Sequence, residues 1–191
     1  MTKPEKFIVW GIPALFLIGG VWHFAFDFVP LTIIAMIAPA NESVWEHMKM
    51  GLLPVIVWWV AYYFVKGKAH NIDKQAWFSA AMVAVIVTVT AMPFLFYFYR
   101  GALGIPMGTY YQSAGAFAFW ADIVILLICN FCGQLLGLHL YRQSKGVSVA
   151  VSVSVMVGMV VLFAVLTFVQ PQVPFWYDHV YGHFGIGTGH F

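Results

Sequence analysis

The sequence predicts an all-α integral membrane protein: a five-helix transmembrane bundle plus one short re-entrant or interfacial half-helix, with the N-terminus inside and the C-terminus outside. The chain has 191 residues, of which 62% are hydrophobic and 8% are charged. A soluble domain carries roughly 25% charged residues, so a soluble fold is excluded. Five apolar runs reach the length of about 20 residues that a helix needs to cross a bilayer.

The five runs cover residues 7–26, 48–65, 75–98, 115–141 and 147–169. The first follows a basic segment, as in a secretory signal. It has span length, however, and no small-residue cleavage site follows, so we predict a retained helix. Residues 28–40 are apolar but too few to cross. Pro30 and Pro39 lie near their ends, and we predict a half-helix that protein must shield from lipid. Neither a repeat nor a soluble second domain is evident, so residues 1–191 are predicted to form a single transmembrane domain.

Basic residues separate the two sides of the predicted bundle. Seven of them flank the spans on one side: Lys3, Lys6, Lys66, Lys68, Lys74, Arg142 and Lys145. Only Lys49 and Arg100 fall on the other side. By the positive-inside rule the first side is cytoplasmic. No basic cluster or motif indicates DNA or RNA, so no nucleic-acid partner is expected.

Acidic and imidazole groups gather at the predicted outer end. They are Asp27, Glu42, Glu46, Asp178, His23, His47, His179, His183 and His190. Such groups can bind a divalent cation, move protons or perform acid–base chemistry. His23 and Asp27 are spaced i, i+4 and would share one helical face. They are either metal ligands or a hydrogen-bonded pair that holds the half-helix in place.

The segment "NESVWEH" has the pattern of a helix start. Ser43 and Glu46 match a capping box, in which each side chain bonds the backbone of the other. Glu42 and Glu46 are an i, i+4 like-charge pair, which is unfavourable without a cation. Glu46 and His47 are adjacent and would point about 100° apart on a helix. Capping and a working site therefore both remain open for this segment.

The tail "PQVPFWYDHVYGHFGIGTGHF" has two interpretations. Asp178, His179 and His183 could fold back over the outer mouth and add ligands, since His179 and His183 have a common metal-ligand spacing. Alternatively, Trp176 and Tyr177 hold an interfacial tail.

Two charged groups stand apart from these motifs. Asp122 lies within a predicted span, where a carboxylate is a functional candidate by default. Arg100 begins an external loop and either pairs with an outer carboxylate, holds an anionic headgroup, or rests at the interface.

The combination "HFAFDF…APANESVWEHMKM" with "PFWYD" and "YGHFGI" in the tail resembles a family of small bacterial integral-membrane proteins catalogued as a domain of unknown function, with the signature N-E-S-x-W-E-H-x-K. The resemblance covers most of the chain and implies a multi-pass protein of the bacterial cytoplasmic (inner) membrane, with no established activity. It marks His23, Asn41, Glu42, Ser43, Trp45, Glu46, His47, Lys49 and Asp178. The tail adds His183 and a trailing "GTGHF", a departure that weakens a metal role for His183 and His190.

Three functions are consistent with these residues. The first is a membrane enzyme acting on a lipid or headgroup, by a zinc-like divalent metal or by acid–base chemistry alone. Its candidate catalytic residues are Glu46, His47, Glu42 and Asp27. Its candidate metal ligands are His23, Asp27, Glu42, His47 and Asp178, and its candidate substrate contacts are Arg100, Asn41, Lys49 and Asp122. The second is a small transporter of protons, metal ions or a solute, working as a homo-oligomer or with a membrane partner. The third is an assembly or scaffold protein.

Overall fold

The computed structural model describes residues 1–106 and 115–186. All the secondary-structure elements assigned within these residues are α-helices. In chain order these are α1 (Lys3–His23), α2 (Ala25–Phe28), α3 (Thr32–Ile37), α4 (Val44–His47), α5 (Lys49–Lys66), α6 (Lys74–Leu103), α7 (Gly115–Gln143) and α8 (Val149–Phe168). Within the described residues, α1, α4 with α5, α6, α7 and α8 give five stretches long and apolar enough to cross a membrane. The predicted fold class, a multi-pass helical membrane protein, is confirmed.

The helix ends differ from the predicted runs for local reasons. α1 begins earlier because Thr2 and Glu5 form a capping box, each side chain bonding the other's backbone N–H. It ends at His23, three residues early, because Phe24 leaves helical geometry. α6 runs five residues past the predicted end at residue 98. The helix continues past Arg100 because the Arg100 side chain is buried. It ends where Gly104 adopts a left-handed backbone conformation.

The predicted half-helix at residues 28–40 contains one shorter helix, α3, and a separate short helix, α2, precedes it at the end of the predicted first run. α2 ends before Pro30 and α3 begins after it, because proline lacks an N–H and restricts the residue before it. α3 packs against α8. The indole of Trp22 donates to the Ile37 carbonyl at 3.0 Å, which holds the end of α3 against α1. Protein thus covers only the end of this segment, where residues 38–40 are buried, whereas residues 28–33 around the break are exposed. The predicted shielding from lipid is therefore wrong for the break itself.

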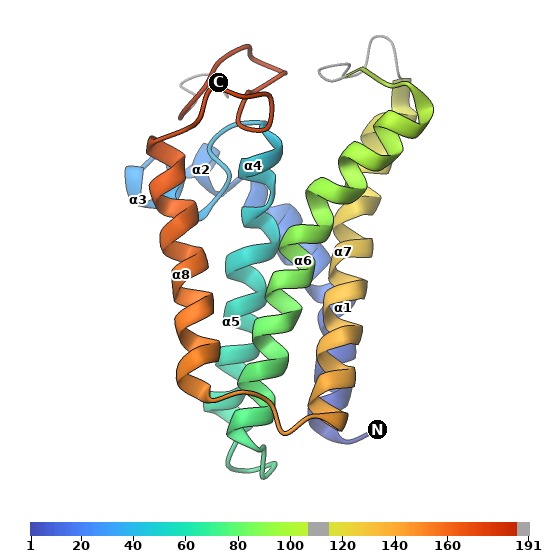
Figure 1. Cartoon of the computed structure of the whole chain (residues 1–191), viewed down its shortest axis with the longest axis vertical. Helices are drawn as coiled ribbons and strands as arrows, with labels where there is room; N and C mark the ends of the chain where they lie inside the picture. Colours follow the sequence, from blue (N-terminus) through green and yellow to red (C-terminus); the bar gives the residue numbers. More distant parts are fainter. Residues whose placement is uncertain (107–114, 187–191) are drawn as a thin grey trace.

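The spans form a bundle in which α1 begins at one end and α8 finishes at the other (Figure 1). α6 packs against α7, α5 and α8, and α1 packs against α7 and α5. Glycines allow the close approach of α6 and α7: a Cβ on Gly133 would lie 2.7 Å from the Ala84 carbonyl oxygen. The upper parts of α6 and α7 lean away from α4 and α8 in Figure 1. We call the end that carries α4 and the C-terminal segment the α4 end.

Charge is distributed very unevenly over the bundle. All seven basic residues predicted to be cytoplasmic are exposed, and they lie opposite the α4 end. Lys49 and Arg100, the two exceptions, are 0% and 2% exposed. The α4 end therefore shows no exposed lysine or arginine in the described residues. This sharpens the asymmetry behind the orientation prediction.

Candidate functional site

The loop before α4 is organised by hydrogen bonds that only partly match a capping box. Ser43 Oγ accepts from the Glu46 N–H at 3.2 Å, as predicted. The reciprocal bond is not formed, so that half of the prediction is wrong. The Glu46 carboxylate accepts instead from the Ala40 N–H at 2.9 Å, and the Ser43 N–H donates to Asn41 Oδ1 at 2.8 Å. The Glu46 side chain turns away because a buried cation draws it.

That cation is Lys49, and its surroundings form a closed polar cluster. Lys49 and Glu46 are both 0% exposed, with Nζ and Oε2 2.6 Å apart. Nζ also donates to Thr167 Oγ1 at 2.6 Å and to the Ala35 carbonyl at 2.7 Å. An ammonium has three hydrogens, so these three short bonds satisfy it. Lys49 thereby ties α3, α5 and α8 together beneath the loop. We call Glu46, Lys49 and Thr167 the buried cluster.

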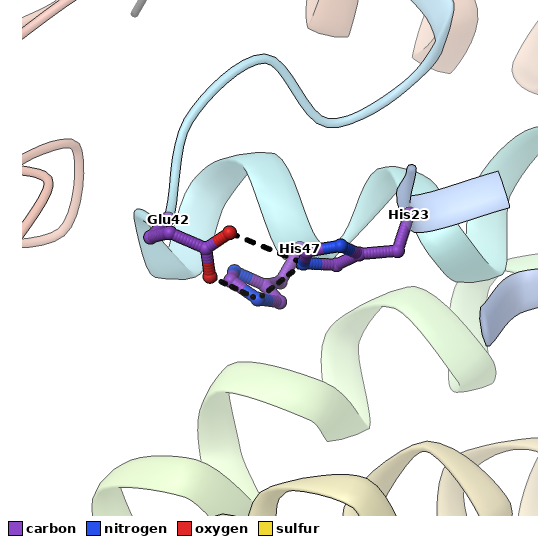
Figure 2. Close-up of side chains that lie close together, drawn as sticks. All are labelled: His23, Glu42 and His47. Atoms are coloured by element: carbon purple, nitrogen blue, oxygen red, sulfur yellow. Dashed lines mark hydrogen bonds and ion pairs between the residues drawn. The ribbon is translucent and has the colours of Figure 1, made fainter. Parts of the chain in front are cut away.

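Three other side chains converge beside this cluster (Figure 2). His23 Nε2 lies 3.2 Å from His47 Nε2 and 3.5 Å from Glu42 Oε1. His47 Nε2 lies 3.3 Å from Glu42 Oε2. They come from the end of α1, the loop before α4, and α4 itself. Because Glu42 precedes the helix, it does not stack on Glu46 as an i, i+4 pair. Glu46 contacts Lys49 in the buried cluster, whereas His47 contacts Glu42 and His23. We call His23, Glu42 and His47 the triad.

The triad has the dimensions of a metal site. Zinc binds histidine nitrogen and carboxylate oxygen at about 2.0–2.2 Å in tetrahedral geometry, which places neighbouring ligand atoms about 3.4 Å apart. The three separations in the triad are 3.2, 3.3 and 3.5 Å, where the last two reach different oxygens of Glu42. With one ligand atom taken from each residue, all three atoms lie within 4.8 Å of one another. This is the one group of three or more such residues found within ligand distance in the described residues.

The surroundings of the triad also prepare its atoms for a cation. His47 Nδ1 lies 2.8 Å from the Ser43 carbonyl. A carbonyl only accepts, so Nδ1 carries the hydrogen and Nε2 of neutral His47 presents its lone pair to the triad. Burial raises the pKa of the Glu42 carboxyl, but His23 and His47, when they carry the hydrogen and charge that face it, together outweigh burial and hold the pKa far below its usual range. Glu42 is therefore an anion at neutral pH.

The remaining candidate ligands have other partners. Asp178 is 0% exposed; its Oδ2 accepts from the Glu42 N–H at 2.9 Å, and its Oδ1 accepts from two N–H groups of the tail. Asn41 Nδ2 donates to the Gly185 carbonyl at 2.6 Å. The tail therefore folds back onto the loop, as one interpretation predicted. Asp178 holds the backbone of Glu42 and is not a member of the triad.

Asp27 is also outside the triad. It lies half-buried on α2, beyond the break at Phe24, so the helical face predicted for the pair with His23 is interrupted. In the tail, His183 Nε2 lies 3.8 Å from Asp178 Oδ2. His190 lies outside the described residues. The triad is thus smaller than the predicted ligand set.

Arg100 and Asp122 pair with each other between α6 and α7. Arg100 Nη2 lies 2.8 Å from Asp122 Oδ2, and the Tyr99 hydroxyl donates to the other oxygen of Asp122. The guanidinium also lies 4.5 Å from the ring centre of Phe96 and donates to the Pro106 carbonyl. Arg100 therefore forms an ion pair, as one interpretation predicted, but its partner is the carboxylate predicted to lie within a span and not one of the outer carboxylates.

A cavity of about 630 Å³ joins these features. Its polar lining is His23, Glu42, His47 and Asp122, and the rest is apolar: Phe16, Leu17, Gly20, Val21, Phe24, Val44, Met50, Met92, Phe96, Phe119, Ile123, Ile125 and Leu126. Asn41, Glu46, Lys49, Arg100 and Asp178 do not line it. Sequence reasoning did not anticipate this cavity, because its walls come from four separate parts of the chain.

Comparisons with known proteins give a family and no activity. A model of a family of unknown function, DUF6512, matches residues 1–186. No curated protein and no solved structure matches the chain.

Proposed function

The chain belongs to DUF6512, a family of unknown function, and we propose that it is a metal-dependent membrane enzyme whose triad holds one divalent ion, zinc by preference. The observation that carries this proposal is the convergence of two imidazole nitrogens and one carboxylate: the nitrogens lie 3.2 Å apart, each lies 3.3 or 3.5 Å from one oxygen of Glu42, and one ligand atom from each residue lies within 4.8 Å of the others. Two imidazoles with one carboxylate suit zinc, whereas magnesium and calcium prefer oxygen ligands.

Hydrogen counting supports a cation within the triad. When both imidazoles are neutral, His47 Nε2 is a lone pair and Glu42 is an acceptor. Only His23 can then supply a hydrogen, and one hydrogen cannot serve both neighbours. At least two hydrogen-bond acceptors would then face each other about 3.3 Å apart with no hydrogen between them. A metal ion resolves this conflict, and so does a proton on His47, the competing explanation that the experiment below separates.

Three protein ligands leave a fourth tetrahedral position open, which is the arrangement of catalytic rather than structural zinc sites. A divalent ion there would polarise a carbonyl and activate a water molecule. The cavity lies directly against the triad, so a substrate can reach that position. Hydrolysis of an ester or amide is the reaction class that fits one such ion. Water's oxygen adds to the carbonyl carbon, the carbon–oxygen or carbon–nitrogen bond breaks, and the leaving group takes water's proton.

The charge distribution supports placing this site at the outer face of a bacterial cytoplasmic membrane, because exposed basic residues lie at the opposite end. In this proposal Asp122, across the cavity, is a substrate contact. Asn41, Lys49 and Asp178 position the loop that carries Glu42.

A divalent-ion carrier is the second candidate. The helix break at Phe24 falls directly beside His23, and transporters commonly build ion sites at interrupted helices. Liposome uptake of zinc separates this candidate from the enzyme, because only a carrier would accumulate the ion.

Metal analysis tests the proposal. Protein purified in mild detergent without chelator should hold about one equivalent of zinc, as the site has one set of ligands. His47→Ala should lose it. His139→Ala is the matched control, since His139 is an exposed imidazole on α7 outside the triad. Wild-type protein that stays metal-free after incubation with zinc would refute the metal site and leave a protonated His47 as the cation.

A further inference from the structure

We propose that the substrate is a long-chain amphiphile with an uncharged ester or amide head, which enters the cavity sideways from the bilayer. This inference rests on the proposed function, because it names the substrate class of the same site. Three observations carry it: the apolar walls of the cavity, the exposure of its rim, and the absence of any lysine or arginine from its lining.

The rim of the cavity reaches the surface that faces lipid. Leu17 and Val21 of α1, and Phe24 directly after it, line the cavity, and they are 65%, 72% and 51% exposed. Large apolar side chains this exposed on a membrane-spanning helix contact lipid chains rather than water. A lipid chain can therefore pass between the bilayer and the cavity without crossing an aqueous layer.

The size and chemistry of the cavity suit a hydrocarbon chain. Its volume of about 630 Å³ falls within the roughly 300–1,000 Å³ typical of small-molecule sites. Lipid tails and apolar side chains are equally apolar, so a chain gains little by moving between them. Recognition must then come from the polar end, where the triad and Asp122 lie.

The polar end favours an uncharged head. A phosphate would have the metal ion as its only cationic partner, because the described lining has no cationic side chain, and the Glu42 carboxylate would lie beside it. Arg100 cannot serve, because it is 2% exposed and already bonded to Asp122. An ammonium is no better placed, since Glu42 would be occupied by the metal and Asp122 by Arg100. An ester or amide carbonyl needs only the open metal position.

Gly20 gives a clean way to fill the cavity. It lines the cavity, and an added Cβ would meet nothing within 4 Å. The backbone at Gly20 therefore accepts a side chain, and we expect the ring of Gly20→Phe to take up space in the cavity. Gly158→Phe is the matched control: Gly158 is also a helical glycine with nothing within 4 Å of an added Cβ, and it lies on α8, away from the cavity lining.

The test is photo-crosslinking in detergent with two probes of one diazirine-bearing chain, an uncharged monoacylglycerol and an anionic lysophosphatidic acid. The monoacylglycerol should label wild-type protein more strongly, at cavity-lining residues. Gly20→Phe should reduce this labelling about tenfold or more, which corresponds to about 1.4 kcal/mol of binding free energy. Gly158→Phe should label like wild type. In wild-type protein, excess unlabelled monoacylglycerol should suppress labelling and excess lysophosphatidic acid should not.

Two results would overturn the inference: equal labelling of Gly20→Phe and wild type, or stronger labelling and competition by the anionic lipid. Zinc content, measured on the same samples, keeps the two proposals apart. Zinc without selective labelling refutes the substrate class alone. Selective labelling without zinc refutes the enzyme alone.

Discussion

Replacing Lys49 with methionine should be the most damaging single change at the α4 end. The ammonium is fully buried and donates to Glu46, Thr167 and the Ala35 carbonyl. Methionine keeps most of the volume and removes the charge, which leaves the Glu46 carboxylate buried without its cation. Breaking one partner of a buried ion pair costs about 3–5 kcal/mol. The equilibrium constant for unfolding should therefore rise by roughly two to four orders of magnitude, since 1.4 kcal/mol is tenfold.

A double variant isolates the cause. Glu46→Gln alone leaves the Lys49 ammonium unpaired and should destabilise by a similar amount. In Glu46→Gln/Lys49→Met no buried charge remains, and an amide oxygen can still accept from the Ala40 N–H. The double variant should recover at least about 1 kcal/mol relative to the sum of the singles, within the range that contacting residues show. Equilibrium unfolding in mixed detergent micelles, followed by circular dichroism, measures all four proteins.

Either of two outcomes would contradict this reasoning. One is a Lys49→Met protein within about 1 kcal/mol of wild type, less than the cost expected of a buried unpaired charge. The other is strict additivity in the double variant. Glu46→Leu would be a poor substitute in this cycle, because it also removes the acceptor of the Ala40 N–H.

Three further predictions concern the triad and the helix packing. Glu42→Gln should weaken zinc binding by more than about tenfold in titration calorimetry, because an amide is a poorer zinc ligand than a carboxylate. It should also make the free energy of unfolding depend less on pH in acid. A carboxyl whose pKa is lowered by folding contributes stability that is complete above its unfolded pKa, near 4.5. That contribution is lost as the pH falls through the folded pKa, and Glu42→Gln has no such contribution to lose. Asp178→Asn should keep the triad's ligands but weaken zinc binding by about 10–100-fold, the usual effect of removing a supporting partner; unchanged affinity would show that the Glu42 backbone needs no such support. Gly133→Leu should lower the free energy of unfolding by about 1–3 kcal/mol, because its side chain would push α7 from Ala84 of α6, and a thermal shift in detergent equal to wild type would refute the close packing.

Hydropathy was enough to predict the spans, because lipid imposes a minimum length and a low charge on every crossing helix. It could not predict the helix ends. α1 stops at His23 through backbone geometry at an apolar residue, and α6 continues past Arg100 because that charge is buried against Asp122. Neither the break after His23 nor the burial of Arg100 is visible in the local amino-acid composition.

The members of the triad were all among the candidates, but their selection was not predictable. His23 and Glu42 are separated by two short helices whose directions depend on contacts with α1, α5 and α8. Glu42 and Glu46 looked equivalent in sequence. The turn before α4 sends Glu42 to the imidazoles, and Lys49 draws Glu46 into the buried cluster. Motif resemblance marked both glutamates without distinguishing their roles.

The triad residues and the residues that support them are synthesised at different times. The three ligands lie within residues 23–47, so the ribosome delivers them with the first two spans. Thr167 and Asp178, which hold the buried cluster and the Glu42 backbone, emerge last. A nascent chain therefore presents all three triad side chains before the residues that hold their loop in place have emerged. In the proposed metal site, ion binding could then precede closure of the fold, and a ribosome stalled before α8 would display the first without the second.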